Sequence, residues 1–173
     1  MGLEEAGAAS YFAAFGECLT GEGFVFLARS RRPPGNPINA MLSFGYQVLW
    51  NHLLTLIELQ GLDPYYGCLH QGHEHHAALA SDLIEEFRAS IVDSLVSSLA
   101  NRELVSVVDD FEYHDGGCYL NQSGRRKFLQ AFLQWMEESV ENQPCRNLLS
   151  QQVIAYKRFV YDPSRMYSPY LIR

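Results

Sequence analysis

The chain lacks the features that mark several classes of protein. No apolar run approaches the roughly eighteen residues that a membrane-spanning helix requires, so we expect a soluble protein without a membrane span. Residues 1–20 contain three glutamates and no basic segment, which is unlike a secretory signal peptide. The four cysteines are far apart and form no CxxC pair, so neither a disulfide framework nor a zinc ribbon is expected. Reduced thiols in a cytosol fit this pattern best.

Positive charge is also scarce for a protein that would bind nucleic acid. Thirteen basic against twenty acidic residues give a net charge of −7, whereas DNA-binding proteins usually carry a basic field. The basic residues are nevertheless clustered, at Arg29–Arg32 and at Arg125–Lys127. Eleven of the thirteen are arginine, which suits bidentate phosphate contacts, although ordinary surface ion pairs fit the same count. Local anion binding is therefore compatible with an acidic chain.

Apolar spacing predicts a mainly α, bundle-like fold for this chain of 173 residues, which is long enough for one domain. The predicted helices span residues 3–19, 37–60, 75–101 and 121–139. Asn36 before Pro37 is predicted to cap the second helix, and Asn121 or Ser123 the fourth. Residues 103–120 are rich in β-branched side chains with two glycines and predict one short β-hairpin. No repeat is visible, and no element is assigned beyond residue 139.

The segment 69–88 holds residue types that bind a divalent metal. His70 lies fifteen residues ahead of Glu85, near the start of an amphipathic helix. Imidazole nitrogen with carboxylate oxygen suits Mn2+ or Mg2+, and these ions stabilise the charge that develops in phosphoryl transfer. On spacing alone a solvated helix face is the commoner arrangement. The helix also places Asp82 and Glu86 on the polar side with Glu85, away from an apolar stripe, so spacing does not choose among the three carboxylates. The stripe consists of Ile84, Phe87, Ile91 and Leu95.

Four segments together resemble the signature blocks of one family. They are GLEEAGAASYF, SRRPPGNPINAMLSFGYQVL, LDPYYGCLHQ followed by ALASDLIEEFR, and YLNQSGRRKFLQAF. In order and approximate spacing they resemble the Cas-one family, the CRISPR adaptation integrase, over about residues 2–132. The resemblance implies that residues 1–173 are a single helical, metal-dependent catalytic domain without the β-rich N-terminal domain of the family. We therefore expect an excised domain, a piece of a larger fusion or a natural short version.

The resemblance also implies a catalytic metal centre. The expected ligands and catalytic residues are Glu4, His70 and Glu85. Glu5 stands where the family usually has glycine, so Glu4 and Glu5 remain alternatives for the first carboxylate. Asp82 matches the acidic neighbour of Glu85 and is expected to support the ligands from behind, together with Ser43 and Tyr46. The histidines of the HEHH run, residues 73–76, fall in a variable insertion and are expected to bind metal only adventitiously.

DNA contacts are expected on the segment that leads into the second helix. The expected residues are Arg29, Arg31, Arg32 and Asn39, with Arg88 one turn beyond Glu85. A solvated turn is the alternative for the arginine run. Asn39, Ser43 and Tyr46 fall on successive helical turns, where they can reach phosphate or position a water. Capping by Asn39 and core hydroxyls at Ser43 and Tyr46 fit the sequence equally well.

The implied function is that of an endonuclease and integrase that inserts new spacers into a CRISPR array by transesterification, in antiviral defence. The implied partners are branched or prespacer DNA, the CRISPR repeat and the Cas-two protein, with a homodimer for the full-length member, in the cytoplasm of a prokaryote. We expect weak integration from this chain alone, because paired active sites require an assembly. A DNA-binding or scaffold module that has lost catalysis is the first alternative. An unrelated helical metal phosphohydrolase is the second.

Overall fold

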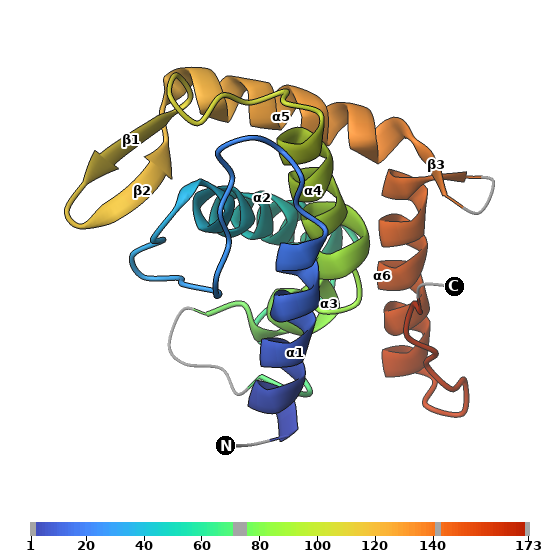
Figure 1. The fold of residues 1–173 in the computed structure, drawn as a ribbon. Coiled ribbons are helices and arrows are strands. Elements are labelled where there is room, and N and C mark those ends of the chain that lie inside the picture. The colour runs from blue at the N-terminus through green and yellow to red at the C-terminus, as the bar shows by residue number, and fades with distance from the viewer. Residues whose placement is uncertain (1–2, 71–75, 141–142, 172–173) are drawn as a thin grey trace. The chain divides into compact units, whose positions relative to one another are not determined.

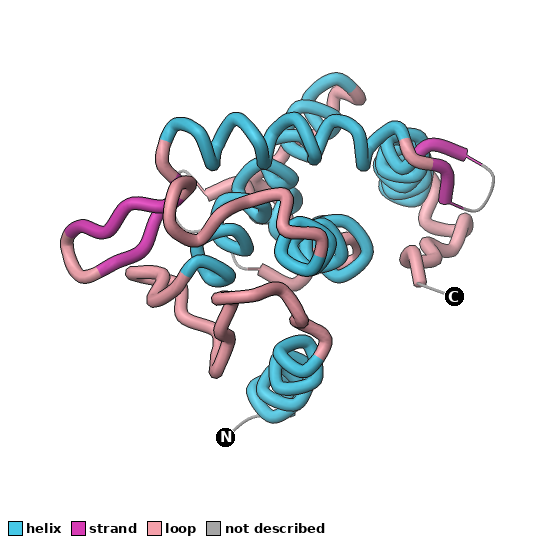
Figure 2. The backbone as a smooth tube through the Cα atoms, turned by 45° about the horizontal axis from the view of Figure 1, so that its top comes forward, coloured by secondary structure: helices cyan, strands magenta, loops and turns pink. Residues whose placement is uncertain are grey.

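The computed structural model describes residues 3–70, 76–140 and 143–171, and these are predominantly helical (Figure 2). The helices are α1 Leu3–Glu17, α2 Pro37–Leu59, α3 Ala78–Ile84, the π-helix η1 Arg88–Asp93, α4 Ser94–Asn101, α5 Gln122–Glu137 and α6 Cys145–Tyr161 (Figure 1). The strands form two antiparallel pairs, β1 Phe111–His114 with β2 Gly117–Leu120 and β3 Ser139–Val140 with β4 Gln143–Pro144. The predicted mainly α class is confirmed. The short second pair and α6 were not foreseen.

Tertiary contacts divide the chain into two compact units. Unit 1 comprises Met1–Gly45 and Asp93–Leu133, and unit 2 comprises Tyr46–Val92 and Gln134–Arg173. Three helical segments, α2, η1 and α5, contribute residues to both units. Among the described residues, no helix is long and apolar enough to cross a membrane.

Side-chain oxygens begin two of the helices, as the sequence predicts. The backbone N–H of Asn39 donates to Oδ1 of Asn36 at 2.9 Å, so Asn36 is the N-cap of α2. At the start of α5, the N–H of Gly124 donates to Oδ1 of Asn121 at 3.0 Å. Asn121 is therefore the cap of that helix, and the alternative Ser123 donates its hydroxyl to Asp110 instead, at 2.7 Å.

The predicted hairpin forms, but it is shorter than the predicted segment. Phe111 pairs with Leu120 and His114 with Gly117, which leaves Asp115 and Gly116 as a two-residue turn. Both turn residues have positive φ, 50° and 73°, as the Asp-Gly hairpin turn requires. Residues 103–110 are not a strand.

The helix predicted over residues 75–101 is interrupted. The N–H of Phe87 donates to Ile84 O at 3.0 Å, a bond of three-residue spacing, and the π-helix η1 follows. The predicted apolar stripe is nevertheless buried throughout: Ile84, Phe87, Ile91 and Leu95 are 1–6% exposed. Apolar spacing thus identified the buried face correctly. Apolar spacing did not reveal the break. A bond of three-residue spacing followed by the five-residue bonds of a π-helix barely changes which residues face inward.

In unit 1, α1 packs through aromatic side chains. The rings of Phe12 and Phe15 meet edge to face at 6.3 Å, and Phe15 meets Phe26 of the following segment at 5.5 Å. Tyr11 donates its hydroxyl to Oδ2 of Asp93 at 2.6 Å. Asp93 is only 4% exposed, so this bond anchors α1 at a buried position.

A buried carboxylate joins the hairpin of unit 1 to α5. Asp110, with 0% exposure, accepts hydrogen bonds from the Lys127 ammonium at 2.6 Å and from the N–H of Ser106 at 2.7 Å. The Ser123 hydroxyl donates to its other oxygen. Burial raises the pKa of Asp110, but the bonds from Lys127, Ser106 and Ser123 outweigh burial and hold the pKa below its ordinary value.

We expect Asp110→Asn to lower the free energy of unfolding by about 1–3 kcal/mol at neutral pH, because the amide disrupts this set of donors. A depressed pKa stabilises the fold above the ordinary value of 3.8 and ceases to do so as the pH falls through the folded value. The difference in free energy of unfolding between wild type and Asp110→Asn should therefore stay constant above pH 3.8 and narrow as the pH falls below it. Urea titrations across pH measure it, with the exposed neighbour Asp109→Asn as the control. A stability difference that does not depend on pH would contradict the depressed pKa of Asp110 as its cause.

Candidate functional site

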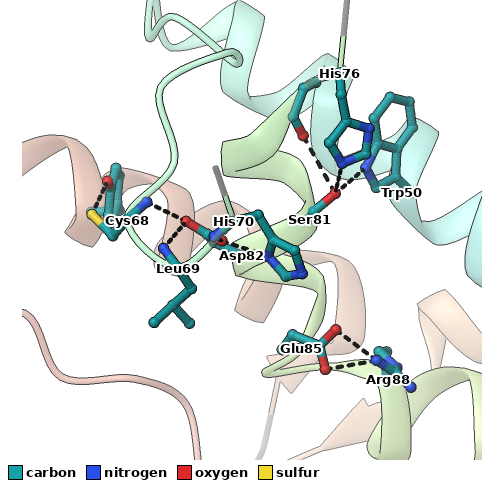
Figure 3. Close-up of polar contacts among 11 residues, drawn as sticks. Trp50, Cys68, Leu69, His70, His76, Ser81, Asp82, Glu85 and Arg88 are labelled. Atoms are coloured by element: carbon teal, nitrogen blue, oxygen red, sulfur yellow. Dashed lines mark hydrogen bonds and ion pairs between the residues drawn. The ribbon is translucent and has the colours of Figure 1, made fainter. Parts of the chain in front are cut away.

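In unit 2, the carboxylate of Asp82 in α3 holds the loop that carries His70 (Figure 3). Its Oδ1 accepts the backbone N–H of His70 at 2.9 Å and lies 2.7 Å from Nδ1 of the same residue. Its Oδ2 accepts the N–H of Leu69 at 3.0 Å and the N–H of Cys68. A single side chain, itself 9% exposed, therefore fixes both the backbone and the ring of His70.

The chain reaches this arrangement through a close approach at Gly67. A Cβ on Gly67 would lie 2.7 Å from Oδ2 of Asp82 and 2.8 Å from Cβ of Ala78, closer than side chains pack. The N–H of Leu79 also donates to Pro64 O at 2.9 Å, so the loop is attached to α3 at both ends. Only glycine at position 67 therefore allows the loop to approach α3 this closely.

The same bonds set the charge of Asp82. Burial raises its pKa, but hydrogen bonds from the Leu69 N–H, the His70 ring and N–H, and the Cys68 N–H outweigh burial and hold the pKa below its ordinary value. Asp82 is consequently a carboxylate at neutral pH. A carboxylate that contacts Nδ1 favours the tautomer with the proton on that nitrogen, which leaves the Nε2 lone pair of His70 as the coordinating group.

Glu85 follows α3 and forms an ion pair with Arg88. Nη1 of Arg88 lies 2.6 Å and 2.7 Å from the two carboxylate oxygens. The guanidinium carbon lies 4.8 Å from the centroid of the Tyr46 ring, within the range of a cation–π contact. The His70 ring and the Glu85 carboxylate lie on the same side of this segment (Figure 3). The predicted ligand Glu85, the predicted phosphate contact Arg88 and the predicted support Tyr46 are therefore neighbours.

Glu86 bonds to the C-terminal segment instead. It accepts hydrogen bonds from the Tyr167 hydroxyl and from the N–H of Tyr170, the latter at 2.6 Å. Burial raises the pKa of Glu86, and the bonds from Tyr167, Tyr170 and Gln152 offset only part of the rise. The structure thus separates three carboxylates that helical spacing left equivalent: Asp82 lies behind His70, Glu85 is exposed, and Glu86 holds the C-terminal segment.

A cleft of about 750 Å³ lies beside this site, within unit 2. Cys68, Asp82 and Glu85 contribute to one wall. The other wall is aromatic and comes from α6 and the segment after it, and it includes Tyr156, Phe159, Tyr167 and Tyr170. The carboxylates therefore border an apolar cavity that opens to solvent.

A contact that the sequence did not signal is made by Ser81, the residue next to Asp82 in α3. The indole Nε1 of Trp50 donates to the Ser81 hydroxyl at 3.1 Å, and Nε2 of His76 lies 2.9 Å from the same oxygen. The His76 ring stacks on Trp50 with centroids 6.2 Å apart. His76 of the HEHH run thus has a packing partner in α2, whereas His73 and His75 lie outside the described residues.

The remaining predicted site residues belong to unit 1. Glu4 and Glu5 lie in α1, but their side chains are outside the described part, so the choice between them stays a prediction. Asn39 is 1% exposed and binds the preceding segment, accepting the N–H of Ser30 at 2.9 Å and donating to Ala28 O at 2.9 Å. Asn39 is therefore not the cap of α2, which is Asn36, and its expected contact with DNA stays a prediction.

Arg29 completes this inward-facing network. Its Nη1 donates to Oδ1 of Asn39 at 2.8 Å and its Nη2 to the Ser43 hydroxyl at 3.0 Å. Arg31 and Arg32, in contrast, are exposed. The three arginines of the run therefore differ: one braces the turn before α2, and two face solvent.

Comparison with known proteins places these residues in a family. The model of "CRISPR associated protein Cas1" matches residues 1–134. This chain belongs to the Cas1 family. A CRISPR-associated endonuclease Cas1 of Thermus thermophilus is 40% identical over 141 residues, which cover 82% of this chain and 44% of that protein.

Solved structures of Cas1 relatives share the fold. A casposase bound to an integration product has a TM-score of 0.84 at 27% identity, with 92% of this chain and 46% of that chain covered. A Cas6-RT-Cas1–Cas2 complex also gives 0.84 at 26% identity, with 98% of this chain and 19% of that chain covered. The chain spans less than half the length of each of these relatives. They confirm the helical Cas1 domain expected from the sequence.

We expect Gly67→Ala to displace the His70 loop, since the added Cβ would overlap Asp82 and Ala78. The free energy of unfolding should fall by about 1–3 kcal/mol, the usual cost of overpacking. Gly7→Ala is the matched control, because a Cβ there meets nothing within 4 Å and alanine favours the helix. Urea denaturation compares the two variants. Equal stability of both would mean that the loop is not held as described.

Proposed function

We propose that this Cas1 chain is the catalytic domain of a metal-dependent DNA endonuclease and integrase that inserts spacers into a CRISPR array in the cytoplasm of a prokaryote. The observation that carries the proposal is the His70 ring held by Asp82, one helical turn before the exposed Glu85. The chain is also 40% identical to a protein named CRISPR-associated endonuclease Cas1. The reaction is the attack of a DNA 3′-hydroxyl on a phosphodiester of the repeat. A new phosphodiester forms as the old one breaks, and the other strand end leaves as a hydroxyl.

The donor atoms suit Mn2+ or Mg2+. His70 offers an imidazole nitrogen, Glu85 a carboxylate with 44% side-chain exposure, and Glu4 is the proposed third ligand from α1. Among the described residues no three such side chains converge, and the Glu4 side chain is not among them. When bound, a divalent ion stabilises the charge that develops on the phosphate.

The protein's own groups orient this chemistry. Asp82 holds the His70 ring by Nδ1, as carboxylates behind metal-bound histidines do, and this contact fixes the direction in which Nε2 points. Arg88 places a guanidinium beside Glu85, where it can contact a DNA phosphate. We propose that Tyr46 keeps Arg88 in place through the face of its ring.

The proposed partners are DNA and a Cas2 protein. One structural relative is bound to an integration product, and another is part of a Cas1–Cas2 complex. Because this chain covers less than half of each relative, we propose that efficient two-ended integration and homodimer formation require residues beyond it. The isolated chain should nick or hydrolyse branched DNA slowly.

We expect His70→Ala and Glu85→Ala each to abolish the cleavage of branched DNA with Mn2+, and to lower Mn2+ affinity in calorimetric titrations. Glu4→Ala should do the same and Glu5→Ala should not, which decides between these two neighbours. Glu58→Gln is the control, because Glu58 is an exposed glutamate of α2 remote in sequence from the proposed ligands.

A specific observation favours one alternative function. Arg88 already neutralises Glu85, as it would in a DNA-binding or scaffold module that has lost catalysis. Arg88→Ala distinguishes the two: removing the competing cation from a catalytic centre should raise Mn2+ affinity even while DNA binding weakens. Branched DNA that remains uncut by wild type, with Mn2+ affinity unchanged in the His70 and Glu85 variants, would favour the scaffold.

A further inference from the structure

Helix α1 carries Glu4 in its first half, but its described buried side chains lie in its second half. Among the side chains of residues 6–17, only Phe12 and Phe15 are buried. Residues 6–10 are exposed and comprise three alanines, a glycine and a serine, which offer little surface for packing. Apolar contacts of residues 6–10 therefore do not fix the first half of the helix.

One polar contact lies where the two halves of α1 meet. The hydroxyl of Tyr11 donates to Oδ2 of Asp93 at 2.6 Å, and Asp93 is 4% exposed. This length is typical of a hydroxyl that donates to a carboxylate, which is a strong hydrogen bond. We propose that Tyr11 and Asp93 are positioning residues for the metal centre, because their bond holds the first half of α1 where Glu4 can bind the ion.

Helical spacing connects Tyr11 with Glu4. Seven residues complete almost two turns of an α-helix, so positions 4 and 11 lie about 20° apart around the axis and roughly 10 Å apart along it. Position 5 lies about 120° from position 11. The face of α1 that is turned toward Asp93 therefore contains position 4 and not position 5, which favours Glu4 over Glu5 as the ligand.

Asp93 belongs to the helical segment that follows Glu85. Arg88, the first residue of η1, pairs with Glu85, and Asp93 is the last residue of η1. π-helical turns are frequent at functional sites. Because a π-turn contains more residues than an α-turn, Asp93 lies on a different side of the segment from the one that an unbroken α-helix would give it. The interrupted helix thus leads from the proposed ligand Glu85 to the residue that anchors α1.

A single substitution removes this bond and leaves the packing of α1. Tyr11 is 42% exposed, and its ring meets the ring of Phe12 edge to face at 5.2 Å. Tyr11→Phe keeps this ring contact and deletes only the hydroxyl, so the buried Asp93 loses that donor. The variant therefore changes how α1 is attached without removing apolar surface from the core.

The inference rests on the proposed function for the metal centre and adds the residues that place one of its ligands. Two measurements test it separately. Mn2+ affinity reports the ligand, and hydrogen exchange of the metal-free protein reports the attachment of α1. A wrong ligand and a wrong anchor therefore give different results.

The first experiment is a double-mutant cycle on the full 173-residue chain, with Mn2+ affinity measured by calorimetric titration. Tyr11→Phe should weaken Mn2+ binding roughly tenfold, the lower end of the range for loss of a group that holds a metal ligand. In the Glu4→Ala background the same substitution should have no effect, because the ligand that it positions is gone. A hydroxyl with a general structural role would act equally with and without Glu4. Tyr161→Phe is the control, at an exposed tyrosine of α6.

The second experiment compares hydrogen exchange of the metal-free wild type and Tyr11→Phe. The amides of residues 7–10 should exchange faster in the variant, since their side chains are exposed and the Tyr11 bond is lost. The amides of residues 14–17 should keep their exchange rates, because Phe15 is buried there and Asn101 donates to Cys18 O at 2.8 Å just beyond the helix. Tyr161→Phe should exchange like wild type throughout α1.

A matched pair at the acceptor tests the same bond from its other side. Asp93→Asn keeps an oxygen that can accept the Tyr11 hydroxyl, whereas Asp93→Leu does not. Asp93→Asn should therefore bind Mn2+ more tightly than Asp93→Leu, and Asp93→Leu should match Tyr11→Phe. This pair carries the comparison if Tyr11→Phe does not fold, as judged by circular dichroism.

The proposal is overturned if Tyr11→Phe binds Mn2+ like wild type while Glu4→Ala binds it weakly, or if Tyr11→Phe weakens binding equally with and without Glu4. Unchanged exchange of residues 7–10 would also overturn it. Wild-type Mn2+ affinity in Glu4→Ala, together with faster exchange in Tyr11→Phe, would refute Glu4 as a ligand and with it the positioning role. The attachment of α1 through Asp93 would then stand without a link to the metal.

Discussion

The candidate metal centre depends on one buried carboxylate. Asp82 accepts the N–H groups of Cys68, Leu69 and His70 and contacts the His70 ring, so it replaces the water that these groups would otherwise bind. The close approach of Gly67 makes the loop short enough for this. Because the loop has no regular secondary structure of its own, its position relative to α3 comes chiefly from this side chain.

Both units use a buried polar side chain to hold an irregular segment against a helix. In unit 1, buried Asp110 joins the hairpin to α5, and buried Asn39 joins the turn that carries the arginines to α2. Each polar side chain has its partners, which is the condition under which burial of a polar group is tolerated. Both carboxylates keep a depressed pKa for this reason. Irregular segments near the proposed binding residues are thus held by polar bonds, while the helices pack through apolar stripes.

Residues of the same charge that lie close together in the sequence therefore have different structural roles. Asp82 and Glu85 are separated by a single helical turn, yet one is buried behind a histidine and the other pairs with Arg88 in solvent. Arg29 and Arg31 are two residues apart, yet one braces Asn39 and Ser43 and the other faces a cleft. In each case burial decides, because a buried polar group must be paired inside the protein, whereas an exposed one can exchange its partner for a ligand.

The sequence alone determined the helical class, the cap at Asn36, a hairpin within residues 103–120 and the buried stripe from Ile84 to Leu95, since each follows from local spacing and local hydrogen bonding. For the cap of α5 it left Asn121 and Ser123 as alternatives, and the structure selects Asn121. Family blocks also pointed to His70, Asp82 and Glu85. Only the tertiary structure decided the break of the helix after Ile84, the separate roles of Asp82, Glu85 and Glu86, and the presence of Arg31 and Tyr119 in one cleft. The last two features arise from contacts between residues distant along the chain, and the first from a local change in backbone hydrogen bonding; periodicity encodes neither.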